Sequence, residues 1–397
     1  MAQTSPSTAN PLLRLWRNED SRGVIIQILT MVVLCAFIAV IARNVVINLA
    51  NVGKEFSFDF LMWPAAYDIG FSPFIEYTNK STHLRAAVVG LLNTLLVAFW
   101  GCILATILGF ILGIMRLSSN WLINKISYVF LEFVRNVPVL IHILAIYALV
   151  VTLLPSAKEA LDIGGGAFFL SNRGFYVPSP VFEPGAGTVG IAILVAIVIV
   201  IGFRRWAKRV QDQTGRIYPV LWVSLALLIG LPGITFLATG TPLSWEIPVL
   251  KGFNFKGGMA LKPEFLALWL ALSYYTACFI AEIVRAGILA VSHGQTEAAH
   301  ALGLRNNRTL QLIVIPQALR VIVPPLCSQY LNLTKNSSLA IAIGYMDITA
   351  TLGGISLMQT GKEMETMIIV MGVYLVISLT ISSFMNWFNQ RIKLTER

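Results

Sequence analysis

Long apolar segments restrict the fold of this chain more than any other feature. About eight segments hold roughly 20 predominantly apolar residues each, the length that an α-helix needs to cross the hydrocarbon core of a bilayer. They are Val24–Ala42, Ala86–Met115, Tyr128–Leu154, Gly187–Phe203, Ile217–Ala238, Phe265–Ile283, Leu310–Tyr330 (with a possible continuation through Leu339–Gly344) and Thr366–Phe388. Only 12% of the residues are charged, against about 25% in soluble domains. The sequence therefore predicts an all-α fold, a polytopic transmembrane helical bundle of about eight spans.

Lysine and arginine residues concentrate in every second connection between these segments. They occupy the N-terminal tail, the loops after the fourth and sixth segments, and the C-terminus: Arg14, Arg17, Arg22; Arg204, Arg205, Lys208, Arg209, Arg216; Arg285, Arg305, Arg308; Arg391, Lys393, Arg397. Loops rich in these residues stay on the cytoplasmic side of a membrane, so eight spans place both termini in the cytoplasm. We attribute the net charge of +10 to contact with anionic membrane lipid and expect no nucleic-acid binding.

A short polar segment, GQTEAAHALGLR at residues 294–305, follows the sixth apolar segment. Ser292 and Gln295 have the spacing of a capping box at a helix start. Gly303 falls where a helix end often needs a left-handed residue, and the alanines between form a small apolar stripe that another surface can approach closely. The residues alone leave two interpretations open: an ordinary loop between membrane helices, or a docking helix for another protein.

The segment is similar to the EAA loop of permease subunits of ABC importers, with Glu297, Ala298, Ala299 and Gly303 at the positions of that family's E-A-A and later G. The strings AEIVRAGI (281–288), PQALRVIVPPL (316–326) and LEFVRNVPVLIHIL (131–144) resemble the polar-amino-acid branch, the histidine and glutamine type. The additions to a minimal five-span permease resemble the long permease subunits of general L-amino-acid transporters from Gram-negative bacteria.

This resemblance implies a type I ABC-importer core that takes up L-amino acids at the expense of ATP. It implies four kinds of partner: a second homologous permease subunit, two copies of a cytoplasmic ATPase, a periplasmic amino-acid-binding protein and the L-amino acid itself. The ATPase would bind ATP and Mg²⁺, and this chain would hold no cofactor. The location implied is the bacterial inner membrane, with several passes. The residues expected to couple to the ATPase are Gly294, Gln295, Glu297, Ala298, Ala299, Leu302, Gly303 and Leu304.

The same resemblance divides the chain into a permease core and additions to it. A cytoplasmic tail (1–23) and an extra span with a periplasmic loop (24–84) come before the first part of the core (85–154). An insertion with two spans and periplasmic loops (155–263) separates it from the second part (264–390). The coupling loop covers about 285–312, and residues 391–397 form a cytoplasmic C-terminus.

Motifs for catalysis are missing from the sequence. It contains no G-x-x-x-x-G-K-[ST] phosphate loop, so ATP hydrolysis is expected in a separate chain and this chain is not expected to be an enzyme. The four cysteines are dispersed and the four histidines offer no complete ligand set, so no catalytic or metal-binding residue is predicted. Two other classes stay open: an ion-coupled secondary transporter or channel for small polar solutes, and a polytopic membrane enzyme or assembly scaffold. Few acidic residues lie inside the spans, which argues against proton coupling.

Polar residues inside the apolar segments are candidates for a substrate path, since a zwitterion needs both hydrogen-bond donors and acceptors. These candidates are Asn93, Thr94, Lys335, Asn336, Ser337 and Ser338. Two of them depart from the family's pattern, because Asn336 and Ser337 stand where relatives usually carry Asp and Thr. The alternative is that these side chains only pack within the bundle.

Charged residues near the spans occur at helical spacing. Glu132 and Arg135 are three residues apart, as are Glu282 and Arg285, a separation that allows pairing on one helix face. We expect both pairs to brace the cytoplasmic mouth; direct contact with substrate is the alternative. A G-x-x-x-G pair at residues 109–113 predicts close helix packing.

Overall fold

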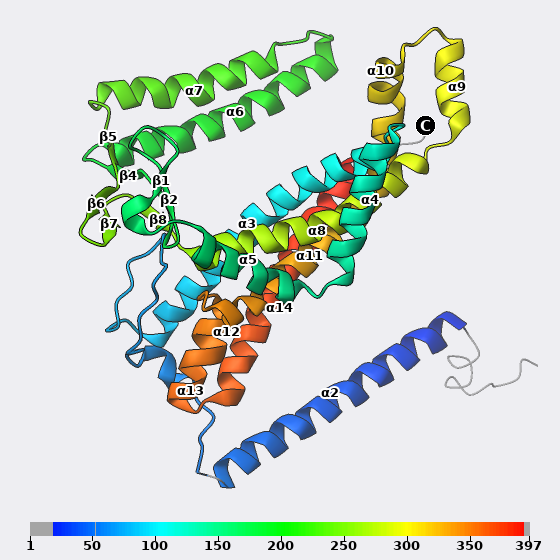
Figure 1. The fold of residues 1–397 in the computed structure, drawn as a ribbon. Coiled ribbons are helices and arrows are strands. Elements are labelled where there is room, and N and C mark those ends of the chain that lie inside the picture. The colour runs from blue at the N-terminus through cyan, green and yellow to red at the C-terminus, as the bar shows by residue number, and fades with distance from the viewer. Residues whose placement is uncertain (1–18, 52, 393–397) are drawn as a thin grey trace, which may run out of the picture.

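The structure is a computed structural model that describes residues 19–51 and 53–392. Long helices form its central bundle, and several of them lie side by side in Figure 1. The helices of the bundle are α3 (His83–Met115), α4 (Trp121–Asn136), α5 (Val139–Leu153), α8 (Pro263–Leu289), α11 (Ile315–Asn336) and α14 (Glu363–Ile392). Leu268 and Leu272 of α8 are completely buried, together with Val97 of α3 and Leu333 of α11. The core therefore lies between α8, α3 and α11.

Glycines bring α3 and α8 unusually close to each other. A β-carbon placed on Gly113 would lie 2.8 Å from the carbonyl oxygen of Ala281 and 2.8 Å from the β-carbon of Val284. Real side chains do not approach so closely, so only glycine allows this helix contact. The close packing predicted from the G-x-x-x-G pair is confirmed.

The third apolar segment is not one straight helix, contrary to the prediction. The axes of α4 and α5 differ by 105° at a break between them. Val137 has an extended backbone and Pro138 follows it, because a proline disfavours helical geometry in the residue before it and has no N–H to donate. The carbonyl of Val134 thus loses its helical partner, and the Nε2 of His142 donates to it over 3.1 Å instead.

The seventh apolar segment continues past its predicted core, as the longer alternative proposed. It comprises α10 (Asn306–Thr309), the π-helical turn η3 (Leu310–Val314), α11 and the 3-10 helix η4 (Ser337–Ile343). Pro316 lies in the first turn of α11, while Pro324 and Pro325 lie inside it. Gly344 ends this run in the left-handed conformation, the usual role of glycine at a helix terminus.

Residues 53–82, here called the strap, cross one end of the bundle beside α12 (Ile348–Ala350), η5 (Thr351–Ser356) and α13 (Leu357–Thr360) (Figure 1). The strap contains a short helix, η1 (Asp59–Met62). The Lys54 ammonium pairs with the Glu363 carboxylate at 3.0 Å, and the Ser57 N–H donates to Oε1 of the buried Glu365 over 3.1 Å. The strap therefore fixes the first turn of α14.

The insertion between α5 and α8 carries eight short strands among the described residues, where only turn-rich loops were expected. Four of them form an antiparallel sheet in the order β1-β2-β3-β8, and the other four pair as β4-β5 and β6-β7. Their bounds are β1 (Leu161–Asp162), β2 (Phe169–Ser171), β3 (Gly174–Val177), β4 (Ser179–Phe182), β5 (Leu243–Glu246), β6 (Val249–Lys251), β7 (Asn254–Lys256) and β8 (Met259–Leu261), with η2 (Ala157–Glu159) before them. Phe175 pairs with Leu261 in register, so the two ends of the insertion are joined.

Between β4 and β5 the chain forms a helical hairpin of α6 (Ala186–Thr214) and α7 (Val220–Ala238) (Figure 1). The buried side chains of α6 recur every fourth residue at Ala192, Ala196 and Val200, which is the spacing of one helix face. Most of the other apolar side chains of the hairpin are exposed. The hairpin is thus packed mainly on itself.

Seven helices in the described part of the chain are long and apolar enough to cross a membrane, and the bent pair α4–α5 brings the number to eight. This agrees with the predicted bundle of about eight spans. The first of them, α2 (Glu19–Asn51), is exposed along its apolar length and lies apart from the bundle in Figure 1. The protein is a multi-pass membrane protein.

Candidate functional site

The predicted coupling segment forms a short helix, α9 (His293–Ala301), which projects with α10 from one end of the bundle (Figure 1). Gly303 follows it in the left-handed conformation, with φ +77°. The N–H of Gly303 donates to the His300 carbonyl over 2.9 Å, and the N–H of Leu304 donates to the Ala299 carbonyl over 3.1 Å. These two bonds are the pattern of a Schellman motif, so the predicted role of glycine at this helix end is confirmed.

The capping box expected at the start of α9 does not form. Ser292 occupies the cap position, but its side chain accepts no hydrogen bond from the helix. The Oε1 of Gln295 instead accepts from the Nε2 of Gln317 over 3.4 Å. Gln295 therefore links α9 to the first turn of α11, a tertiary contact that competes with the local cap.

The outer face of α9 is small and apolar. Ala299 is buried and holds the helix against the protein, whereas Ala298 and Ala301 are exposed. Leu302 is 82% exposed, and a β-carbon on Gly294 would touch nothing. An exposed leucine beside small residues gives a surface that a partner's groove can approach closely.

Charged side chains connect the bundle beneath α9. Glu282 of α8 pairs with Arg116 at 3.6 Å and with Arg285 at 3.7 Å, so the second predicted charge pair is confirmed. Arg116 follows α3 and donates to Oδ1 of Asn124 on α4 over 2.9 Å. The contacts therefore link the C-terminal ends of α3 and α8 to the first turn of α4.

The first predicted charge pair is wrong, because Glu132 and Arg135 form no ion pair in the described structure. The Asn136 amide donates to Oε2 of Glu132 over 3.3 Å, while the guanidinium of Arg135 lies over the ring of Phe279 at 5.4 Å. Glu132 and Arg135 thus contact Asn136 and Phe279, respectively, rather than each other.

Lys335 and Asn336 belong to a polar face of α11 that faces away from the core. Lys335 is exposed and Asn336 is half-buried. Ser328 and Asn332, which sequence reasoning missed, are exposed at the same helical spacing. The Lys335 ammonium has no ion pair or hydrogen bond among residues 19–51 and 53–392. An unpaired lysine inside a membrane span is costly in lipid and marks a water-filled or functional surface.

Ser337 and Ser338 bond to the preceding turn rather than outward. The Ser337 hydroxyl donates to the Thr334 carbonyl over 2.7 Å, and the Ser338 hydroxyl donates to the Lys335 carbonyl over 2.8 Å. Ser337 also lies 3.5 Å from the hydroxyl of Tyr374 on α14. These contacts support the short 3-10 segment in which both serines lie.

Asn93 and Thr94 of α3 are completely buried. The Asn93 amide donates to the carbonyls of Phe71 and Met346, each over 2.9 Å, and the Thr94 hydroxyl accepts from the N–H of Ile348 over 3.1 Å. In this conformation they join α3 to the strap and to α12. The Oδ1 of Asn93 is the exception, since it is buried without a partner.

Asp347, also missed from the sequence, stands at the centre of this polar cluster. Its Oδ1 accepts from the N–H of Ala350 over 2.8 Å and caps α12, and its Oδ2 accepts from the hydroxyl of Tyr374 over 3.1 Å. Burial raises the pKa of this carboxyl to about 6, and these hydrogen bonds moderate the rise. The sequence offers one signal for Asp347: it is an acidic residue three positions after Gly344, which ends the seventh span.

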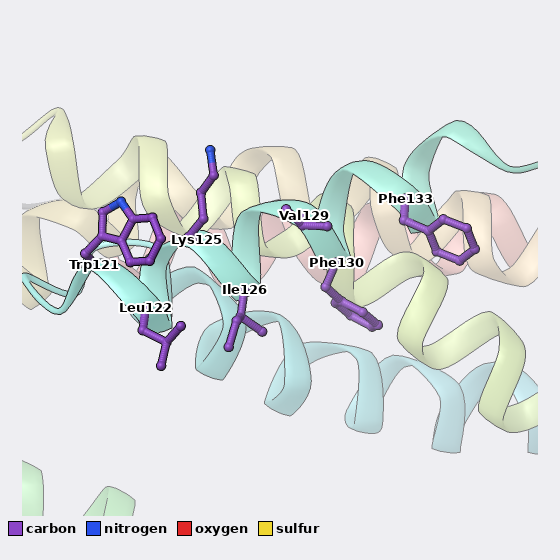
Figure 2. Close-up of a pocket in the computed structure, with 7 residues that line it drawn as sticks. All are labelled: Trp121, Leu122, Lys125, Ile126, Val129, Phe130 and Phe133. Carbon is purple, nitrogen blue, oxygen red and sulfur yellow. The ribbon is translucent and has the colours of Figure 1, made fainter.

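An apolar face of α4 forms a shallow groove of about 500 Å³. Figure 2 shows its seven side chains projecting from the helix, and Lys125 carries the one charge among them: Trp121, Leu122, Lys125, Ile126, Val129, Phe130 and Phe133. The opposite face packs Leu131 and Val134 against α8. Apolar side chains therefore lie both on the face of α4 that packs inside the bundle and on the face outside it, as expected of a helix that contacts lipid.

Comparison with known proteins agrees with this architecture. Residues 105–394 match the family described as binding-protein-dependent transport system inner membrane component. The chain is 48% identical to the general L-amino acid transport system permease protein AapQ of Rhizobium johnstonii, over 95% of this chain and 93% of that protein. It is 46% identical to the putative amino-acid ABC transporter permease protein YhdX of Escherichia coli, over 99% and 98%. Identity to the glutamate/glutamine/aspartate/asparagine transport system permease protein BztB of Rhodobacter capsulatus is 45%, over the full length of both.

Proposed function

The chain belongs to the family of binding-protein-dependent transport system inner membrane components, and we propose that it is the permease subunit of an ATP-driven ABC importer of L-amino acids. The names of three relatives that are similar over almost the whole chain support the substrate class. The observation that carries the mechanism is α9, an exposed small-residue helix fixed at its end by Gly303.

The partners follow from the chemistry that this chain lacks. Without a phosphate-binding loop in its sequence, it needs a separate ATPase, which binds ATP and Mg²⁺ and supplies the energy. We propose two copies of that ATPase, a second homologous permease subunit and a periplasmic amino-acid-binding protein. The complex resides in the bacterial inner membrane. The basic loops support a cytoplasmic position for both termini and for α9, with the strap and the strands of the insertion on the periplasmic side.

Coupling starts at the segment formed by α9 and the turn after it, which carries Gly294, Gln295, Glu297, Ala298, Ala299, Leu302, Gly303 and Leu304. The ATPase holds the exposed residues of this segment, while the buried Ala299 seats the helix on the bundle. The Schellman motif keeps the helix end from unwinding when it is pushed. Gln295 passes the motion to Gln317 at the start of α11. Glu282 passes it to Arg116 and so to α3. The helices then shift between inward-open and outward-open states, a coupling of two sites through a two-state element.

The substrate path runs along the polar face of α11. Lys335 offers a cation to the substrate carboxylate, and Asn336 offers both a donor and an acceptor. Ser328 and Asn332 extend this face by two helical turns. Asn93, Thr94, Ser337 and Ser338 support the path from within the bundle, since their side chains bond to the backbone around it.

An ion-coupled secondary transporter or channel is the alternative function. Its support is the completely buried Asn93, whose Oδ1 lacks a partner near the carbonyls of Phe71 and Met346, since carbonyl oxygens are the ligands of sodium sites. A secondary transporter or channel has no ATPase that would dock on the exposed α9, so the importer is the better proposal.

Native mass spectrometry of the tagged protein, purified gently from its own host, tests the assembly. We expect one copy of this chain, one different permease and two ATPase copies. Uptake into proteoliposomes should then require ATP and the binding protein and be insensitive to ionophores. A homo-oligomer without ATPase, with uptake abolished by an ionophore, would establish the secondary transporter instead.

A further inference from the structure

The tip of the α6–α7 hairpin, residues 203–218, carries a dense positive charge that the importer mechanism does not use. The tip holds one acid, Asp212, and five cationic residues, all of them exposed: Arg204, Arg205, Lys208, Arg209 and Arg216. Throughout the described structure none of these five side chains forms an ion pair, a hydrogen bond or a contact with an aromatic ring. The protein itself therefore does not neutralise this charge.

The arrangement of the cations on α6 makes one broad surface. Arg204 and Lys208 are four residues apart, as are Arg205 and Arg209, so each pair lies along one row of the helix and the two rows are adjacent. Groups in two adjacent rows can contact the same anion or neighbouring anions. The surface is thus suited to a layer of negative charges rather than to a single ion.

The other side of the tip carries an aromatic cluster. The ring of Trp206 lies 5.8 Å from that of Phe203 and 5.0 Å from that of Tyr218, and Trp206 is 48% exposed. Tryptophan and tyrosine are enriched where a membrane protein crosses from hydrocarbon to headgroups. Basic residues and aromatic rings on opposite sides of one short helix segment are the pattern of a membrane interface.

The depth of the tip agrees with this position. Residues 186–203 of α6 are almost entirely apolar and rise by about 27 Å at 1.5 Å per residue, close to the roughly 30 Å of a hydrocarbon core. The cations begin at the next residue, Arg204, where phosphate groups of the lipid lie. An acidic protein partner would not require this match between charge, aromatic rings and depth.

We propose that the hairpin tip is a binding site for anionic phospholipid, with Arg204, Arg205, Lys208 and Arg209 on the headgroups and Trp206 at the acyl-chain boundary. The site gives the hairpin an anchor that the bundle does not supply, because α6 and α7 pack mainly on each other. This inference stands independently of the transported substrate.

Quenching of Trp206 fluorescence by brominated lipid tests the proposal locally. The full-length protein is reconstituted in phosphatidylcholine nanodiscs that contain a small fraction of brominated phosphatidylglycerol or, separately, of brominated phosphatidylcholine. The contribution of Trp206 is the difference between the wild type and Trp206→Phe. We expect brominated phosphatidylglycerol to be enriched around Trp206 at least about five-fold over its bulk fraction. The attraction between a single basic residue and an anionic surface corresponds to an enrichment of about that factor.

The matched variants separate charge from folding. Arg205→Gln with Arg209→Gln should lower the enrichment several-fold, and Arg205→Lys with Arg209→Lys should retain it. Lys251→Gln with Lys256→Gln removes two exposed cations from the strand region instead and should change nothing. Equal quenching by the two brominated lipids in the wild type would overturn the proposal, as would unchanged enrichment in the glutamine variant. Shielding of the tip only when partner subunits are present would assign the charge to a protein contact.

Discussion

Gly109 of α3 and Ile280 of α8 lie in direct contact, so that a β-carbon on Gly109 would come within 2.5 Å of the Ile280 Cγ2. This contact lies at the centre of the bundle, and α8 leads directly into α9. The distance between α3 and α8, the helix that precedes the coupling segment, is therefore set by the missing side chain of Gly109.

Gly109→Ala should lower the stability of the protein by about 1–3 kcal/mol, because even one methyl group overfills this contact. Gly372→Ala in α14 is the matched control, since a β-carbon there meets no atom within 4 Å, and alanine favours a helix. Thermal unfolding in detergent measures both. A Gly109→Ala protein that melts with the wild type would show that the two helices can separate freely.

His142→Leu should lower stability by about 1–3 kcal/mol. The substitution leaves the Val134 carbonyl buried without a donor at the α4–α5 break, and an orphaned buried polar group has a cost of that size. His142→Gln offers an amide donor and should recover most of the loss. If the two variants unfold at the same temperature, packing of the ring against Tyr274 and Tyr275 outweighs the hydrogen bond.

Gly303→Val should insert normally into the membrane but uncouple ATP hydrolysis from uptake. A β-branched residue adopts the left-handed conformation of Gly303 only at considerable cost, so the end of α9 should unwind. Gly303→Asn is the control, because asparagine tolerates this conformation. The ratio of amino acid transported to ATP hydrolysed, in reconstituted complexes, is the measurement; an unchanged ratio in the valine variant would contradict the assigned role of α9.

Lys335→Met should reduce uptake at least about tenfold while the complex assembles normally, since a cation that pairs with the substrate carboxylate contributes at least about 1.4 kcal/mol. Lys335→Arg keeps the charge and should keep most of the activity. Native mass spectrometry checks assembly, and initial uptake rates check function. Full activity of the methionine variant would remove Lys335 from the path.

Stability should depend on pH through Asp347. Its pKa is raised to about 6 from 3.8, so the folded protein holds a proton that the unfolded chain releases in this range, and stability falls as the pH rises from about 4 to 6. The full difference corresponds to roughly 3 kcal/mol. Asp347→Asn should flatten this part of the profile of melting temperature against pH. An identical profile for both proteins would show that the carboxyl is charged at little cost.

Local pattern was enough for the elements that depend on residues close in sequence. The apolar segments other than the third, the left-handed Gly303 and the close-packing glycines at 109–113 were predicted correctly. The reason is that a helix needs only the period and length of its own side chains, and a left-handed turn needs only the missing β-carbon of its own residue. The broken third span had a local signal too, since Pro138 stands at the bend.

Contacts between distant residues escaped prediction. Ser57 bonds to Glu365, and Asp347 bonds to Tyr374, partners that no spacing along the chain reveals. Ser328 and Asn332 were not predicted as part of a polar face, because only the packing of α11 shows which of its faces is exposed. The eight strands were read as loops, since each is at most four residues long and too short to show an alternating pattern.

Hydropathy and backbone freedom are properties of single residues and their near neighbours. They were therefore enough to predict about eight membrane spans and a glycine-ended helix after the sixth. The packing of the helices, by contrast, sets which polar side chains are buried in networks and which face outward on α11. It also brings Gln295 to Gln317, so that Gln295 does not cap its own helix. Those outcomes depend on which surfaces meet when the helices pack, and the free energy of that packing is shared among residues far apart in the chain.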